Sequence, residues 1–454
     1  MRQQVDAASV AVVRITFGVA VVVNTVLYLP VLVQEYYVDT SFHFTYEPFS
    51  FLGPLPGFGM HLVYVAMGAT GVVIALGWQT RVAAAGLLVL NTYVFLLDSS
   101  FFQNHEYLIS LLALLLVVVP TDRRWSLDAR HRGAETRPPT VPRGVVWLLR
   151  FQIGVPYVYG GLAKVNLDWL RGEPLRSWLR GRTDIEPIRS LLTNETVVWT
   201  MTYGALVFDL VIVALLSWRR TRRPAFVVAT GFHLANAWLF GLFIFPWLMI
   251  AATTIFFPPE WPTRLLARRW SGAAVGARVV GSGDLGRSAT PPEPLGVGSV
   301  ARGRWRTRLV AVGITAWVGT QLVVPLRHYL VAGDPSWTEQ AHRFSWHMRL
   351  RAKSGSVTFL VDDGQRTVVV HPVDHLGPKQ SARLVGHPER LVQFARHLSE
   401  LHDGAVVRAQ TIVSLNGRPS QPIVDPEVDL SSVRYRPHGT NDWVLPLEED
   451  PTTG

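Results

Sequence analysis

Val10 to Leu29 reads VAVVRITFGVAVVVNTVLYL, an apolar run in which Arg14 is the only charged residue. A helix needs about 20 apolar residues to cross the hydrocarbon core of a bilayer. The run lacks a small-residue cleavage site and is followed by more apolar segments, so we expect a membrane helix and not a cleaved signal peptide.

Further apolar segments of spanning or near-spanning length follow along the chain. They cover residues 61–77, 82–97, 107–119, 145–162, 197–216, 225–239, 242–257 and 309–324. Several are short, which suits helices that are tilted or buried among neighbours. The pattern predicts a polytopic α-helical membrane protein with about nine helices.

Composition narrows the functional classes. The chain of 454 residues carries a net charge of +10 and no cysteine. The arginines cluster between apolar segments, so we attribute them to membrane topology and expect no nucleic-acid partner. The absence of cysteine excludes disulfides and thiolate chemistry. The sequence has no metal-binding, Walker or dinucleotide-binding motif, so we expect no metal.

Charge asymmetry predicts the orientation. Arginines fill the loops after the fourth, sixth and eighth apolar segments, whereas residues 31–58 carry acids and neither lysine nor arginine. Positively charged loops stay in the cytoplasm, so we expect a cytoplasmic N-terminus and an extracytoplasmic C-terminal region. Residues 165–196 carry arginines on the outer side; we expect this loop to fold against the protein.

The C-terminal composition is that of a soluble domain. β-rich runs at 356–361, 366–370 and 406–414 are separated by turn signals, and an amphipathic helix is expected at 387–401. We therefore divide the chain into four parts: a transmembrane bundle (1–265), a flexible cytoplasmic linker rich in small residues (266–305), a last transmembrane helix (306–330) and a small extracytoplasmic, β-rich α+β domain (331–454).

Lys164 is the most suggestive ionisable residue, because it ends an apolar segment after Gly160 and Gly161. On a helix, Tyr157, Gly161 and Lys164 share a face, and the glycines permit close approach of another helix or a flat ligand. A desolvated lysine could act as a neutral base. From the pattern alone, an interfacial lysine that reaches water is the favoured interpretation.

Other polar groups in the apolar segments have two interpretations. His105, beside Asn104, is either a substrate-orienting group or a polar helix start. His233 and Asn236 share a helix face and bind either a quinone oxygen or each other. For three charged residues, structural ion pairing is the better interpretation: Arg14, Arg150 and Asp209.

Short motifs along nearly the whole chain resemble the vitamin K-dependent γ-glutamyl carboxylase family. Their order and spacing make the resemblance specific. They lie at residues 93–98, 104–108, 125–128, 160–164, 168–169, 232–236, 239–240, 259–262, 344–346, 414–416 and 425–429.

The resemblance implies an activity and a set of roles. In that family the lysine matching Lys164 is the catalytic base that deprotonates vitamin K hydroquinone, and His105 supports it. Oxygenation with O₂ gives the epoxide and a base strong enough to let peptide glutamate capture CO₂. The remaining matches imply a quinone or substrate site formed by Asn104, His233, Asn236 and Trp346, and Tyr157 is added because it shares the face of Lys164. The implied cofactors are reduced vitamin K or menaquinol, O₂ and CO₂. The implied partners are the lipid bilayer and a glutamate-containing peptide, in a bacterial inner membrane.

Three departures keep other functions open. Ala163 stands where animal members carry a second lysine, and His347 stands where they carry an acid. The chain also ends sooner than the animal enzymes. The alternatives are a quinol epoxidase without carboxylation, and a transporter or scaffold on the same fold.

Overall fold

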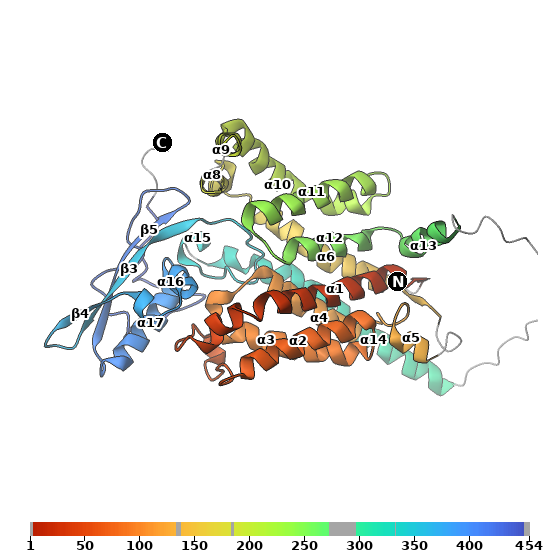
Figure 1. The fold of residues 1–454 in the computed structure, drawn as a ribbon, viewed down its shortest axis with the longest axis horizontal. Helices are drawn as coiled ribbons and strands as arrows, with labels where there is room; N and C mark the ends of the chain where they lie inside the picture. The colour runs from red at the N-terminus through yellow and green to blue at the C-terminus, as the bar shows by residue number, and fades with distance from the viewer. Residues whose placement is uncertain (1–2, 133–137, 183–185, 272–296, 332, 449–454) are drawn as a thin grey trace, which may run out of the picture.

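The computed structural model describes residues 3–132, 138–182, 186–271, 297–331 and 333–448. Figure 1 shows an elongated body of helices with a sheet-containing C-terminal domain at one end. The N-terminus, α5 (Leu127–His131) and α13 (Trp261–Ser271) lie at the opposite end. The two ends of the body are therefore different in kind, as expected of a protein that crosses a membrane with one orientation.

Each of the nine predicted apolar segments lies largely within a helix of the body. These helices are α1 (Ala8–Tyr28), α2 (Gly59–Leu76), α3 (Thr80–Leu97), α4 (Asn104–Val118), α6 (Arg143–Ala163), α10 (Glu195–Ser217), α11 (Arg222–Phe240), α12 (Phe245–Thr253) and α14 (Val297–Val323). A 3₁₀ turn at Thr254–Phe256 extends α12, and another at Val324–Leu330 extends α14.

Fewer helices than nine are long and apolar enough to cross a bilayer unaided. Among the described residues there are five: α1, α2, α3, α10 and the segment Arg308–Leu330. Helices α4 and α12 are apolar but shorter. The structure thus supports a multi-pass membrane protein, and the count of nine crossings stays a prediction.

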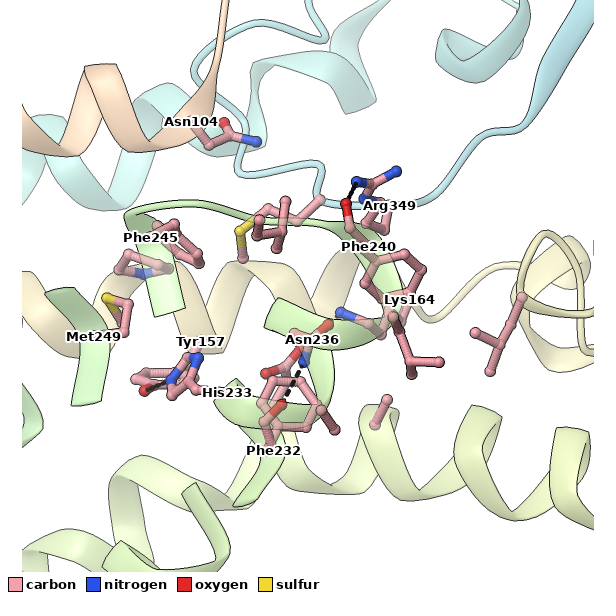
Figure 2. Close-up of a pocket in the computed structure, with 18 of the residues that line it drawn as sticks. Asn104, Tyr157, Lys164, Phe232, His233, Asn236, Phe240, Phe245, Met249 and Arg349 are labelled. Atoms are coloured by element: carbon pink, nitrogen blue, oxygen red, sulfur yellow. Dashed lines mark hydrogen bonds and ion pairs between the residues drawn. The ribbon is translucent and has the colours of Figure 1, made fainter. Parts of the chain in front are cut away.

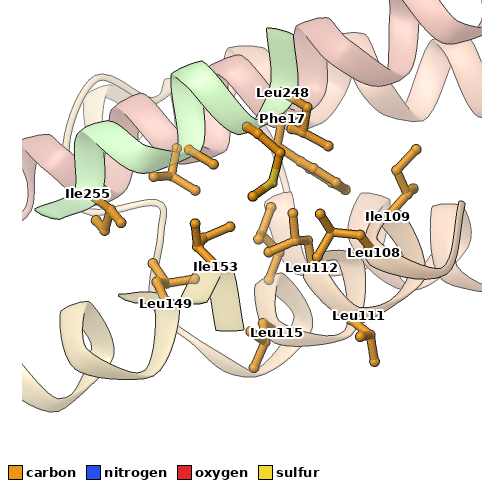
Figure 3. Close-up of a cluster of buried hydrophobic side chains, with 14 of the residues drawn as sticks. Phe17, Leu108, Ile109, Leu111, Leu112, Leu115, Leu149, Ile153, Leu248 and Ile255 are labelled. Atoms are coloured by element: carbon orange, nitrogen blue, oxygen red, sulfur yellow. The ribbon is translucent and has the colours of Figure 1, made fainter. Parts of the chain in front are cut away.

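The body packs around a core contributed by α1, α4, α6 and α12 (Figure 3). Phe17, Leu112, Ile153 and Leu248 are almost completely buried there. Inside a bilayer the surrounding lipid is itself apolar, so close van der Waals packing, not exclusion of water, stabilises such a contact.

Two intramembrane arginines, Arg14 and Arg150, donate hydrogen bonds to backbone carbonyls. The sequence predicted ion pairs for them instead. Arg14 is fully buried and donates to the carbonyls of Thr121 at 3.0 Å and Trp125 at 2.5 Å. Arg150 donates to the carbonyls of Ile255 and Phe257. Carbonyls in loops and at helix ends lack intrahelical partners, so they can accept hydrogen bonds from a buried guanidinium in place of a carboxylate.

The end of the body that holds the N-terminus is tied together by β1 (Gln4–Asp6) and β2 (Thr140–Pro142), which pair antiparallel. The predicted flexible linker 266–305 is helical at both ends, because α13 runs to Ser271 and α14 begins at Val297. Its middle part, 272–296, lies outside the described residues.

The loop between α6 and α10 forms three short helices, α7 (Leu167–Leu170), α8 (Leu175–Arg180) and α9 (Ile188–Thr193). One of its arginines is neutralised locally: Arg176 pairs with Glu173 at 3.0 Å and Glu195 at 2.9 Å. Arg182 donates to the carbonyl of Trp238 on α11. These contacts agree with the expectation that this arginine-bearing loop folds against the protein.

The C-terminal domain contains a three-stranded antiparallel sheet in the order β4-β3-β5. Its elements are α15 (Pro335–Thr338), β3 (Lys353–Asp362), β4 (Thr367–Val370), α16 (Pro378–Leu384), α17 (Pro388–Leu401) and β5 (Val406–Leu415). The three predicted strands and the predicted amphipathic helix are all present. The stripe of Leu391, Phe394, Ala395 and Leu398 on α17 is completely buried against this sheet, as a helix with one apolar face requires.

Polar contacts join the domain to the body. Asp168 accepts hydrogen bonds of 2.7 Å from Asn416 and from Arg418. At a separate point, Asp98 accepts a hydrogen bond of 2.7 Å from Gln380. Both acids belong to motifs noted in the sequence, and both hold the C-terminal domain over the end of the helices.

Candidate functional site

A cavity of about 470 Å³ lies where the body meets the C-terminal domain. Its walls come from the start of α4, the end of α6, α10, α11, α12 and the loop before β3. Figure 2 shows Asn104 and Arg349 on one side of it and Tyr157, His233 and Asn236 on the other. Most of the lining is apolar, with aromatic side chains such as Phe232, Phe240 and Phe245.

Lys164 lies at the C-terminal end of α6, one residue beyond the helix, and is 5% exposed. Its Nζ donates to the carbonyl of Gly160 at 3.2 Å, one turn back, which satisfies a carbonyl that the helix end leaves free. It also pairs with Asp209 Oδ2 at 2.6 Å and lies 5.1 Å from the ring centre of Trp169. The structure contradicts the interfacial interpretation, because the amine is buried and borders the cavity.

His105 and Asn104 enter the cavity from the first turn of α4. His105 Nε2 lies 3.4 Å from the carboxylate of Glu106. Asn104 donates to the carbonyl of His347 at 3.2 Å, so the start of α4 is attached to the loop of the C-terminal domain. These contacts restrain two polar groups at the same cavity as Lys164.

Tyr157 and His233 form a buried hydrogen bond of 2.6 Å between the tyrosine hydroxyl and Nε2. Asn236 donates instead to the carbonyl of Phe232 on its own helix at 2.8 Å. His233 and Asn236 therefore do not bind each other, although both line the cavity. The amide oxygen of Asn236 stays available to a ligand hydroxyl.

Trp346 is the one predicted site residue that does not line this cavity. It is completely buried, and its ring centre lies 5.1 Å from that of Tyr107. The cavity is lined by Met348 and Arg349, which follow it in the same loop. Phe344, Trp346 and Arg349 all have positive φ angles, so this loop has an irregular backbone.

His347 lies within this loop, with its ring centre 4.4 Å from that of His328. Burial, together with the neighbouring His328, Arg351 and Arg327, lowers the pKa of His347 to about 3. The imidazole is therefore neutral at physiological pH. A neutral ring avoids placing another cation beside the two arginines.

One further ionisable residue lines this cavity that was not among the predicted site residues. Asp209 was expected to be a structural ion-pairing residue, and it is paired, but its partner is Lys164 and both line the cavity. The available signal was a lone carboxylate in the middle of the apolar run 197–216. An ionisable residue within a membrane helix is a functional candidate by default.

The donor set of the site suits a flat, mostly apolar ligand with oxygen substituents. The cavity volume falls in the range of small-molecule sites, and a few polar groups interrupt its apolar walls. Within the described ranges, no group of three or more His, Asp or Glu side chains is placed to hold a metal ion. The residues present therefore fit a mostly apolar ligand that carries oxygen substituents.

A second cavity, of about 690 Å³, lies between α7 and the chain near Asn441. It is more polar than the first and is lined by Arg171, Asp334 and Arg418, among others. None of the predicted site residues lines it.

Comparison with known families covers both parts of the chain. Residues 2–261, more than half of the chain, match the family model described as HTTM domain. Residues 306–450 match the model described as vitamin K-dependent gamma-carboxylase, lumenal domain. No solved structure matches this chain.

Proposed function

Because this chain belongs to the vitamin K-dependent gamma-carboxylase family, we propose that it converts reduced vitamin K to the epoxide and couples this to carboxylation of peptide glutamate with CO₂. The observation that carries the proposal is the buried amine of Lys164 at the edge of an apolar cavity. A hydroquinone hydroxyl has a pKa of about 10, similar to that of a lysine amine, so proton transfer between them is nearly balanced.

Lys164 is the proposed base. Its amine takes the proton of a hydroquinone hydroxyl, so the bond from that oxygen to hydrogen breaks and a bond from Nζ to hydrogen forms. His105 lies near Glu106 in the first turn of α4 and is proposed to support this transfer. When bound, reduced vitamin K supplies the electrons that, with O₂, generate a base able to remove a γ-proton from glutamate.

The remaining polar groups are proposed to orient the quinol. Asn104, Asn236 and the Tyr157–His233 pair present amide, hydroxyl and imidazole groups to the same cavity. Trp346 does not line the cavity, so its proposed role is indirect. It packs against Tyr107 and thereby supports the loop that carries Met348 and Arg349.

Exclusion of water follows from the position of the site. The side chains of Lys164 and Asp209 are 6% and 4% exposed, and the loop carrying Met348 and Arg349 lines the cavity. A strong base survives only where water cannot protonate it. The surrounding bilayer suits an isoprenoid tail, which favours menaquinol or a related quinol in a bacterial inner membrane.

The test is an incubation of the purified protein with reduced vitamin K, labelled bicarbonate and a glutamate peptide. Epoxide together with labelled peptide supports the full proposal, and epoxide alone reduces it to a quinol epoxidase. Absence of both products from folded protein that binds quinone overturns the proposal and favours a transporter or scaffold.

Two variants sharpen this test. Lys164→Ala should abolish epoxide formation, because it removes the base; quinone binding by the purified variant shows that the cavity is retained. Arg366→Ala, which removes a largely exposed cation on the turn between β3 and β4, is the control and should retain the wild-type rate. Wild-type activity in Lys164→Ala would remove this amine from the mechanism.

A further inference from the structure

The surroundings of the Lys164 amine are built for a cation. Three groups with negative charge or negative polarisation approach Nζ: the Asp209 carboxylate at 2.6 Å, the Gly160 carbonyl at 3.2 Å and the face of Trp169 at 5.1 Å. A carboxylate, a carbonyl oxygen and an indole face can each bind an ammonium group. The ammonium is the form that exists after the proposed proton transfer.

The close packing of α6 and α10 creates this arrangement. A Cβ added to Gly161 would lie 3.0 Å from the backbone nitrogen of Leu210, the residue after Asp209. A Cβ added to Gly160 would lie 3.0 Å from Met348 Cε, on the side facing the carboxylate. Gly161 thus allows the helices to approach until Asp209 can reach the amine, and Gly160 leaves room for Met348 beside the carboxylate.

We propose, on the basis of the function proposed above, that Asp209 is a positioning residue that acts through Lys164: its carboxylate directs Nζ and holds the ammonium formed when the amine takes a proton. In the active form the amine carries a lone pair and the carboxylate is ionised. Transfer breaks the oxygen–hydrogen bond of the hydroquinone and forms a nitrogen–hydrogen bond on Lys164. The negative charge moves to the hydroquinone oxygen, and the carboxylate itself is unchanged.

Burial makes the contribution of Asp209 large. Both side chains are shielded from water, so attraction between the carboxylate and the new ammonium is weakly screened. Removal of one partner of a buried charge pair is costly because the other charge is left without compensation. Stabilisation of the ammonium therefore lowers the free energy of the transferred state relative to the free amine.

Chemical rescue separates this role from a structural one. In Lys164→Ala, a small primary amine can occupy the vacated space beside Asp209 and replace the missing base. We expect such amines to restore epoxide formation in Lys164→Ala. In Lys164→Ala/Asp209→Asn, the amine concentration needed for half-maximal rescue should rise about a hundredfold. Lys164→Ala/Asp363→Asn changes an exposed turn carboxylate in the same way and should be rescued like Lys164→Ala.

The outcomes distinguish the two proposals. If no amine rescues Lys164→Ala while the variant still binds quinone, the base role of Lys164 fails, and the proposed function fails with it. If rescue is equal with and without the Asp209 carboxylate, the function stands and the role of Asp209 is wrong.

If the variant that carries Asp209→Asn does not fold, a second variant provides the test. In Lys164→Ala/Asp209→Glu, the carboxylate is retained and extends one methylene further into the vacated space. The amine that rescues best should therefore be shorter than in Lys164→Ala. An unchanged preference among methylamine, ethylamine and propylamine overturns the proposal that this carboxylate holds the ammonium.

Discussion

Tyr157 and His233 illustrate how single residues of this site depend on each other. Their hydrogen bond joins α6 to α11 in a region without access to water. A buried polar atom that loses its partner costs about 1–3 kcal/mol, whereas removal of both partners costs much less. The pair therefore has a structural role as well as the proposed contact with quinol.

Tyr157→Phe should lower the unfolding temperature, because it leaves His233 Nε2 without its partner. The expected loss is about 1–3 kcal/mol. Tyr157→Phe/His233→Leu should be less destabilised than the sum of the two single variants. Thermal unfolding of the four proteins in one detergent measures this coupling. Equal stability of Tyr157→Phe and wild type would show that the hydrogen bond contributes nothing.

Among the elements, the contact between α6 and α10 matters most for the site. Gly161→Ala places a methyl group against Leu210, at 2.9 Å from its Cδ2, so the helices must separate. Overpacking of this kind costs about 1–3 kcal/mol, and separation also moves Lys164 away from Asp209. We expect lower stability and slower epoxide formation. Activity and unfolding temperature at wild-type levels would argue against tight packing here.

The matched control for that substitution is Gly231→Ala on α11. A Cβ at this helical position meets nothing within 4 Å. Alanine is also the better helix former, so stability should be unchanged or slightly higher. Only Gly161→Ala should affect the site.

The loop between α15 and β3 should make stability dependent on pH. The pKa of His347 is about 3 in the folded protein, below its ordinary value of 6.5. Between these values the unfolded chain binds more protons than the folded chain, so stability falls as the pH decreases from 6.5 towards 3. Burial and nearby arginines lower the pKa of His342 in the same direction.

His347→Gln should reduce this loss of stability by up to about 1 kcal/mol per pH unit. Unfolding temperatures at a series of pH values below 6.5 measure the slope. The same substitution at exposed His371 controls for loss of an imidazole. If the stability of His347→Gln fell with decreasing pH as steeply as that of wild type, His347 would not be a source of the pH dependence.

At the scale of the whole molecule, the helical body has two different ends. The turn between α10 and α11 carries Arg219 and Arg220, and α11 begins with Arg222 and Arg223. The C-terminal domain lies at the other end, with α8 and α9 on its side of the body (Figure 1). We predict that the C-terminal domain is outside the cytoplasm, because arginine-rich loops stay in it.

The absence of native cysteine allows a direct test of this orientation. Gln365→Cys lies on the exposed turn between β3 and β4, and Arg220→Cys lies on the exposed turn between α10 and α11. A membrane-impermeant thiol reagent should label Gln365→Cys in intact cells. It should label Arg220→Cys only after the membrane is opened. The reverse pattern would invert the topology.

The amino-acid sequence was sufficient for local structure and for the family. Apolar length identified the helices of the body, alternation identified β3 and β5, and a period near 3.6 identified α17, because each pattern depends on neighbours along the chain. Motif resemblance identified the family, which the two family models confirm. It also selected Lys164, His105 and Asn104, all of which line one cavity.

Tertiary structure decided which side chains meet. A helical pattern tells which residues share a face, but not which face of another helix it contacts. For this reason the Lys164–Asp209 pair, the Tyr157–His233 bond and the position of Trp346 behind the cavity could not be read from spacing. The same holds for Arg14, which binds carbonyls 107 and 111 residues away. Partners so distant in sequence are brought together only when the whole bundle packs, because each contact depends on the placement of several helices at once.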